Sequence, residues 1–259
     1  MISRIKEIYN YNDMIWSLVK RDLRGRYKGS FFGFLWNFIN PLCQIIVYII
    51  VFSTIFRSGI DKYYAFLMVG IMPWNFFAES LGQGSGCIVS QADMTKKIYF
   101  PREVLPISTV TSRFVNMCLT FVIVFIIIGF SGIGFSIKAL CFLPIVMILE
   151  YILTLGVTTL LSAITVYFRD IEHITGVVLM AWIWMTPVMY SNDALTGWIS
   201  TVLKLNPMTY VINAYHSILY YKDLPNMGDL GIIAAIGIIC LVIGECVFMH
   251  LEGGFAEEL

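Results

Sequence analysis

The sequence predicts an all-α polytopic membrane protein, and three observations carry that prediction. Of its 259 residues, 58% are hydrophobic and 13% are charged, whereas soluble proteins average about 25% charged residues. The mean hydropathy is +0.79. Apolar runs recur along the chain at roughly the 20 residues that a helix needs to cross a bilayer core about 30 Å thick. The 17 basic and 17 acidic residues leave no basic excess, which excludes nucleic acid as a partner.

Six of these runs are long enough to be transmembrane helices, and we expect them to form one domain over residues 1–259. The second run is the weakest, because Glu79 and three closely spaced glycines interrupt it. In this division, residues 1–30 lie at the membrane surface, 31–190 hold five spans, 191–229 are external, and 230–259 hold the last span and a tail. The runs are Phe31–Phe56, Tyr63–Val89, Val104–Phe130, Leu140–Phe168, Ile171–Tyr190 and Leu230–His250.

The distribution of Lys and Arg predicts the orientation of the spans. Six spans place both termini on one side of the membrane. The segments on that side carry 11 basic residues, and the segments on the other side carry 5 over a similar length. Because cytoplasmic loops are enriched in Lys and Arg, we expect both termini and the Gln91–Glu103 loop in the cytoplasm.

Residues Asn12–Lys28 have the pattern of an amphipathic helix ahead of the first span. Ile15, Leu18 and Val19 recur on one arc, and basic residues occupy the other. Asp22 and Arg26 are four residues apart and so placed to pair. A basic amphipathic helix beside a span is typical of a helix lying in the headgroup plane. A plain solvated helix is the alternative interpretation.

The external stretch Ser191–Asp229 is too long for a simple turn. Each half is apolar on one face and too short to cross a membrane, and Asn206-Pro207 divides the two halves. We therefore expect a hairpin of two short helices that dips into the outer leaflet or covers the outer mouth of the protein.

Motifs for catalysis are missing from the sequence. It has no G-x-x-x-x-G-K-[ST] loop to hold nucleotide phosphates, and its three histidines show no H-E-x-x-H spacing. We therefore expect a protein that is not an enzyme and carries no metal or cofactor of its own.

Four ionisable residues fall inside the predicted spans, where each costs roughly 2.5–3.5 kcal/mol on insertion scales if it faces lipid. Glu79 and Arg113 lie at similar depth on consecutive spans, so they are placed to pair. Glu150 lies nearer the outer half without an evident cationic partner, and Glu245 is close enough to the cytoplasmic end to reach headgroups. The two interpretations left open are a polar lining for a substrate conduit and a structural interhelical pair.

Seven motifs, in order along nearly the whole chain, resemble the transmembrane subunit of type-2 ABC exporters of polysaccharides, the permeases for O-antigen, capsule and teichoic acid. They are Arg21-Asp22-Leu23-Arg24-Gly25-Arg26-Tyr27-Lys28, Leu35-Trp36 with Asn40-Pro41-Leu42, Gly70-Ile71-Met72-Pro73-Trp74-Asn75-Phe76-Phe77, Lys97-Ile98-Tyr99-Phe100-Pro101-Arg102-Glu103, Phe168-Arg169-Asp170-Ile171, Thr186-Pro187-Val188-Met189-Tyr190 and Leu205-Asn206-Pro207-Met208.

The resemblance implies a homodimer in the bacterial cytoplasmic membrane that works with a separate dimer of ATPase subunits, which hold the ATP and Mg²⁺. It implies that a short cytoplasmic coupling helix docks on the ATPase and that the external hairpin is a gate. The residues it assigns to coupling are Asp93, Lys96, Lys97, Tyr99, Phe100, Pro101 and Arg102, and those at the gate are Trp198, Asn206, Pro207 and Tyr210.

The function that we expect is export of a polysaccharide linked to undecaprenyl pyrophosphate. Such a substrate needs cations at the inner interface, and Arg24, Arg26 and Lys28 are placed to supply them, although attraction to anionic lipid explains the same charges. Within the class, the alternatives are a permease for teichoic acid or for a small lipid or drug. A membrane-embedded enzyme acting on glycans or prenyl phosphates is a distant alternative.

Overall fold

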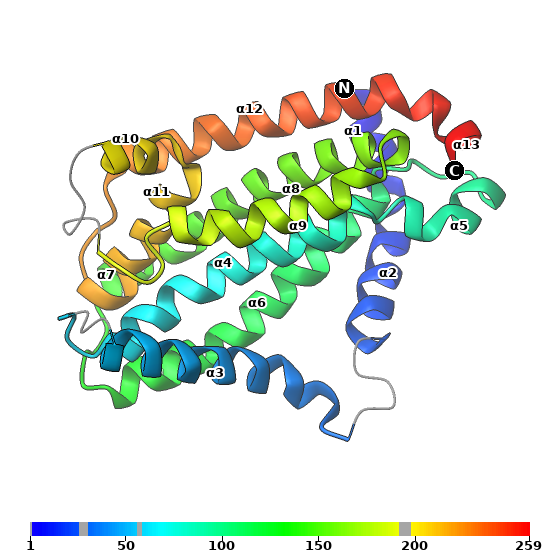
Figure 1. The fold of residues 1–259 in the computed structure, drawn as a ribbon. Helices are drawn as coiled ribbons and strands as arrows, with labels where there is room; N and C mark the ends of the chain where they lie inside the picture. Colours follow the sequence, from blue (N-terminus) through cyan, green and yellow to red (C-terminus); the bar gives the residue numbers. More distant parts are fainter. Residues whose placement is uncertain (1, 26–30, 56–58, 192–197) are drawn as a thin grey trace.

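The computed structural model describes residues 2–25, 31–55, 59–191 and 198–259, and helices are the only regular secondary structure in those ranges. The predicted all-helical class is confirmed. Figure 1 shows most of the longer helices running along one another as a bundle. The longer helices are α1 (Ile2–Asn10), α2 (Asn12–Gly25), α3 (Trp36–Ile49), α4 (Tyr63–Ser85), α6 (Val104–Phe130), α8 (Leu143–Tyr167), α9 (Asp170–Trp182) and α12 (Met227–Leu251); the shorter ones are α5 (Ala92–Lys97), α7 (Ile137–Leu140), α10 (Trp198–Leu205), α11 (Pro207–Tyr215) and α13 (Phe255–Glu258).

Three helical stretches in the described ranges are long and apolar enough to cross a membrane. They are Val104–Phe130, Ile137–Tyr167 and Met227–Glu258. The other three predicted spans correspond to α3, α4 and α9. Of these, α3 is apolar but shorter and continues as a π-helix over Ile50–Ile55. The chain is therefore a membrane-spanning protein, and the count of six spans stays a prediction.

Helix α4 is the centre of the bundle. Its residues from Ala65 to Trp74 are all buried, and it packs against α6, α8 and α9. A helix that is apolar on every side is typical of such a position. Of the three glycines that weakened this span in the sequence, Gly82 and Gly84 lie inside α4, and the helix ends at Ser85 with Gly86 as its C-cap residue. A Cβ atom on Gly84 would lie 2.2 Å from Thr158 Cγ2, so this glycine allows α4 and α8 to pack closely.

Small residues also bring α8 and α12 together. A Cβ atom on Gly156 would lie 2.4 Å from the main-chain nitrogen of Leu241, and one on Gly244 would lie 2.4 Å from the main-chain oxygen of Gly156. Close backbone approach at small residues is a common way for helices to associate in lipid, where apolar burial alone gives little driving force. Figure 1 shows α12 along the edge of the bundle beside α8.

The amphipathic helix lies across one end of the bundle, where Figure 1 shows α2 running crosswise to the long helices. Ile15, Leu18 and Val19 are buried against Val104, Phe248 and their neighbours, while Lys20 and Arg24 are exposed. The apolar arc therefore packs on the bundle, and the basic arc faces outward. This arrangement fits the pattern from which the helix was predicted.

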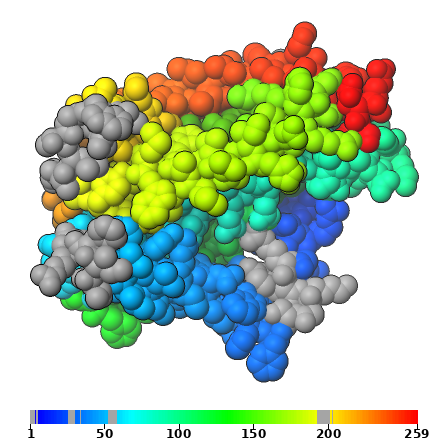
Figure 2. Space-filling model, in the orientation of Figure 1, coloured from blue at the N-terminus to red at the C-terminus, as the bar shows by residue number. Residues whose placement is uncertain are grey.

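Helix α9 presents apolar side chains on the outside of the protein. Val177 is 70% exposed and Met180 is 74% exposed. Figure 2 shows the residues of α9 in the middle of one face, between α12 and α3. Large apolar side chains on an outer face suit contact with lipid or with another helix.

Candidate functional site

The predicted coupling residues follow α4 and precede α6, at the end of the bundle where α5 projects (Figure 1). The structure divides them into two groups. Asp93, Lys96, Lys97 and Tyr99 are exposed, with Tyr99 84% exposed. Phe100, Pro101 and Arg102 anchor the segment: the first two are buried, and Phe100 packs in the same core as Val104 and Leu105. Helix α5 thus projects from the bundle, and the buried residues Phe100 and Pro101 that follow it attach it to the core.

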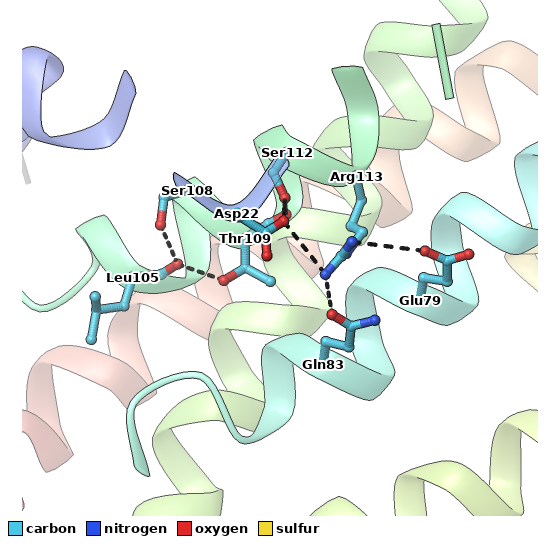
Figure 3. A network of polar contacts seen from close by, with 8 residues as sticks. All are labelled: Asp22, Glu79, Gln83, Leu105, Ser108, Thr109, Ser112 and Arg113. Carbon is cyan, nitrogen blue, oxygen red and sulfur yellow. Dashed lines mark hydrogen bonds and ion pairs between the residues drawn. The ribbon is translucent and has the colours of Figure 1, made fainter. Parts of the chain in front are cut away.

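Arg113 is the centre of a polar network inside the bundle (Figure 3). Its side chain is 3% exposed, and its Nη1 atom lies 4.0 Å from Glu79 Oε2 on α4. Its Nη2 atom lies 3.5 Å from Asp22 Oδ2 on α2 and donates a hydrogen bond to Gln83 Oε1. The structure thus brings together the two residues expected to pair, and adds Asp22 from a third helix.

Asp22 is the residue of this network that the sequence did not reveal. The helical spacing predicted a local pair with Arg26, which lies outside the described residues. Within the described ranges, the Asp22 carboxylate accepts a hydrogen bond from the Ser112 hydroxyl and faces Arg113, and the pair with Arg26 stays a prediction. The signal that could have found it is Ser112-Arg113 itself, a polar pair in an otherwise apolar helix.

Polar side chains continue from Arg113 between α3, α4 and α6. Asn75 Nδ2 donates a 2.9 Å hydrogen bond to Gln44 Oε1, which joins α4 to α3. A cavity of about 30 Å³ lies beside Glu79, Arg113 and Asn116, enough for a water molecule but not for a sugar ring. We call these side chains, from Gln44 and Asn75 to Glu79, Arg113 and Asn116, the polar stripe. In the described part of the chain, the cavity beside it is too small to admit a sugar.

Glu150 on α8 is fully buried, and its partner comes from α11, in the segment predicted to be external. Tyr215, the last residue of α11, donates a 2.7 Å hydrogen bond to Glu150 Oε2. Glu150 Oε1 has no hydrogen-bond partner within the described part of the chain. The sequence offered no cationic partner, and the structure supplies a phenol 65 positions away. By contrast, the remaining intraspan acid, Glu245, is half-buried beside Arg4.

The segment predicted to be external contains two short helices, α10 and α11, which meet at Asn206. The Asn206 side chain caps α11 by accepting from the Met208 main-chain N–H, and Pro207 occupies the first turn. Its Nδ2 atom donates to Met185 O at 2.8 Å and to Thr186 Oγ1 at 2.9 Å. Asn206 therefore fixes the angle between the helices and ties them to the end of α9.

Of the other predicted gate residues, Tyr210 has a local contact, and Trp198 directly follows residues that the structure does not describe. Tyr210 donates a 2.7 Å hydrogen bond to Lys204 O, across the break between the helices. Trp198 begins α10. His216, which the sequence did not single out, stacks on Phe66 with ring centroids 3.9 Å apart and makes a 3.0 Å hydrogen bond with the Phe66 main-chain oxygen. The hairpin is thus held to α4 as well as to α8.

Of the basic residues proposed to contact headgroups, Arg24 is exposed in the last turn of α2. Arg26 and Lys28 lie outside the described residues.

Among the residues that the structure describes, no group of three His, Cys, Asp or Glu side chains is arranged to hold a metal ion.

Comparison with known proteins gives one consistent result. The family described as ABC-2 type transporter matches residues 14–220. The O-antigen export system permease protein RfbA of Myxococcus xanthus is 34% identical over 261 residues, which cover all of both chains. A protein of the same name from Klebsiella pneumoniae is 30% identical over 95% of each chain. The polysialic acid transport protein KpsM of Escherichia coli is 20% identical over 91% of this chain and 92% of its own.

The family match spans most of the chain, including the whole stretch from α2 to the hairpin, and the similarity to RfbA of Myxococcus xanthus runs from end to end. Helices α3 to α11, with the projecting α5, and all but the first two residues of α2 lie within the matched residues, and α12 follows them. This chain is a member of the ABC-2 type transporter family.

Proposed function

We propose that this chain is the permease subunit of an exporter that moves a lipid-linked polysaccharide of the O-antigen type across the bacterial cytoplasmic membrane. The observation that carries the proposal is the end-to-end similarity to two proteins named O-antigen export system permease. As a member of its family, the chain is a transporter membrane subunit and not an enzyme, and a separate ABC subunit hydrolyses ATP. The absence of a nucleotide-binding loop from the sequence is consistent with this division.

The working form that we propose is a homodimer of six-span subunits with both termini in the cytoplasm and the α10–α11 hairpin outside as a gate. The exposed apolar faces of α3 and α9 support contact with a second copy, since Ile46, Val47 and Val177 are each more than half exposed. The excess of Lys and Arg near the N-terminus and α5 supports the orientation.

Docking of α5 on the ATPase is the proposed route by which ATP drives transport. The exposed side chains of Asp93, Lys96, Lys97 and Tyr99 offer a contact surface, and the buried base at Phe100 and Pro101 supports force transmission to α6. ATP and Mg²⁺ belong to the partner subunit in this proposal. Closure of the ATPase dimer would move α5 and rearrange the bundle as rigid bodies.

The substrate in this proposal is a glycan on undecaprenyl pyrophosphate. Arg24, Arg26 and Lys28 are proposed to meet the pyrophosphate at the inner interface. The polar stripe through Glu79 and Arg113 is proposed to line the conduit once the bundle opens, and its hydrogen-bonding groups suit sugar hydroxyls.

Deletion of the gene tests the function directly. We expect loss of the surface polysaccharide together with intracellular accumulation of full-length chains on their lipid carrier. The matched control is complementation with the wild-type gene and with a variant in exposed Lys138, Lys138→Gln, which should both restore export. Normal surface polysaccharide in the deletion strain would contradict the proposal and favour a small lipid or drug as substrate.

The basic residues ahead of the first span have their own test. Replacement of Arg24, Arg26 and Lys28 by Gln should reduce export without reducing the amount of inserted protein. Export at the wild-type level with normal insertion would assign these charges to orientation and lipid attraction alone.

A further inference from the structure

Both ends of the chain meet at the base of the coupling segment. Figure 1 places the N-terminus, the C-terminus, α5 and α13 at the same end of the protein. The residues that follow α12 form a 3₁₀ turn, Glu252–Gly254, and then α13. The proposed function uses only α5 at this end, so these contacts of the chain ends need their own explanation.

Arg4 joins three elements through one guanidinium group. Its Nε atom donates a 2.7 Å hydrogen bond to Glu103 Oε1, just before α6, and its Nη2 atom donates to Glu252, just after α12. Glu103 is 1% exposed. The hydrogen bond to Glu103 raises the pKa of Arg4 further above its ordinary value, so the guanidinium stays charged. Charge-assisted hydrogen bonds of this kind are about twice as strong as neutral ones.

Arg102, inside the coupling segment, is tied to the same C-terminal tail. Its guanidinium donates a hydrogen bond to the Glu252 main-chain oxygen and lies 5.7 Å from the centre of the Phe255 ring. Phe255 is fully buried and packs on Phe248 and Tyr167. The tail is therefore an ordered part of the bundle and the surface on which the coupling segment rests.

A cleft of about 650 Å³ lies between these elements. One wall is residues 95–102 of the coupling segment, and the other wall includes Arg4, Glu7, Glu252, Gly253 and Ala256. Lys96 and Lys97 are exposed on the first wall, as are Ile98, at 57%, and Tyr99, at 84%. The cleft thus combines exposed cations with apolar side chains. We call it the chain-end cleft.

We propose that the chain-end cleft receives a segment of the ATPase subunit, so that α1 and residues 252–259 form the second half of the coupling surface. This proposal rests on the proposed docking of α5. The exposed lysines favour a segment with acidic side chains, and Ile98 and Tyr99 favour an apolar side chain beside them. The size of the cleft fits inserted side chains rather than a flat contact.

The same geometry makes Arg4 a positioning residue for coupling. Because Arg4 and Arg102 bind Glu103 and Glu252, movement of α5 is passed to α6, to α12 and, through α1, to α2. Three elements then respond to the ATPase together. Without the Arg4 bridge, the coupling segment would keep its link to the C-terminal tail through Arg102 but lose this link to α1.

Site-specific photo-cross-linking tests the surface in the assembled transporter. Benzoylphenylalanine is placed at Ala256 in the second wall, at Tyr99 in the first wall, and at Lys138 at the opposite end as a control, with a tagged ATPase subunit co-expressed. We expect Ala256 and Tyr99 to cross-link to the ATPase and Lys138 not to do so. Cross-linking from Tyr99 alone, or from Ala256 to lipid only, would overturn the cleft while leaving α5 docking intact. If Tyr99 also fails, the proposed docking itself is wrong.

Variants test the bridge by comparing export with ATP hydrolysis. Arg4→Gln should lower the export achieved per ATP hydrolysed several-fold, at normal levels of assembled complex. Glu252→Gln should do the same, and the double variant should be no worse than either alone, since the two residues act as a unit. Lys6→Gln removes the same charge from the exposed face of α1 and should have no effect. Equal coupling in Arg4→Gln and Lys6→Gln would overturn the role of Arg4.

Discussion

The Arg113 network and the Glu150–Tyr215 contact both bury ionisable side chains in the bundle, but they differ in compensation and in exposure. At Arg113, one guanidinium faces two carboxylates from two other helices, and the side chains of Asp22 and Glu79 are 36% and 43% exposed. At Glu150, a fully buried carboxyl has a single hydrogen bond from Tyr215. The acids of the first site are partly exposed, whereas both partners of the second are fully buried.

This difference indicates separate mechanical roles. The Arg113 network connects α2 with α4 and α6, beside a small cavity, so it can exchange partners as these helices shift. The Glu150–Tyr215 contact joins the α10–α11 hairpin to α8, and both of its residues are fully buried. Ionisable groups within a membrane protein are costly unless they are paired or face water. The Arg113 network meets this requirement with partly exposed counter-charges, and Glu150 meets it with one buried hydrogen bond from Tyr215.

The largest expected effect comes from removing both acids of the network. The double variant Asp22→Asn with Glu79→Gln leaves Arg113 buried without a counter-charge. Breaking a buried ion pair in this way costs about 3–5 kcal/mol. We expect a marked fall in the thermal unfolding temperature of the purified protein and a loss of assembled transporter.

The single variant Glu79→Gln is the matched control, because Asp22 still faces Arg113 at 3.5 Å. It should lower stability much less than the double variant. If the double variant is as stable as the wild type, Arg113 is not held by these acids, and the contrast between the two sites fails.

A smaller effect is expected at the hairpin. Tyr215→Phe removes the only hydrogen-bond donor to Glu150 within the described ranges and leaves a buried acceptor unpaired. Such a loss costs about 1–3 kcal/mol. Limited proteolysis of the 192–222 segment should become faster as the hairpin loosens.

Tyr210→Phe provides the comparison, because it removes another tyrosine hydroxyl from the same helix. That hydroxyl donates to the main-chain oxygen of Lys204, which is an exposed residue. Its effect should stay within about 0.5 kcal/mol. Equal proteolysis rates for the two variants would show that Glu150 does not hold the hairpin.

The sequence could predict those features that depend on interactions between residues close together in the chain. Local patterns predicted α2 from the spacing of Ile15, Leu18 and Val19, and the helix break from Asn206-Pro207, because periodicity and capping are properties of neighbouring residues. Depth along consecutive spans was enough to suggest that Glu79 and Arg113 are neighbours. These predictions needed no knowledge of how distant elements pack.

The contacts that were missed all join distant elements. Arg4 and Glu252 are 248 positions apart, Asp22 and Ser112 are 90 apart, and Glu150 and Tyr215 are 65 apart. No local pattern marks such partners, because the i to i+4 rule indicates only neighbours within one helix. Gly84 of α4 belongs with these contacts, because its lack of a side chain makes room for Thr158 from another helix.

Among the ionisable residues of the two sites, the smallest effect that we expect is in Glu150→Gln, and it gives the sharpest test of the contrast. The amide oxygen can occupy the position of Glu150 Oε2 and accept the same hydrogen bond from Tyr215, so only the capacity for charge is lost. If this site acts by a hydrogen bond alone, the free energy of unfolding should change by about 1 kcal/mol or less, and export should continue. A stable Glu150→Gln protein that no longer exports would mean that the carboxyl changes its state during transport. The hairpin contact would then be a moving part like the Arg113 network, and the distinction between a mobile site and a fixed one would have to be given up.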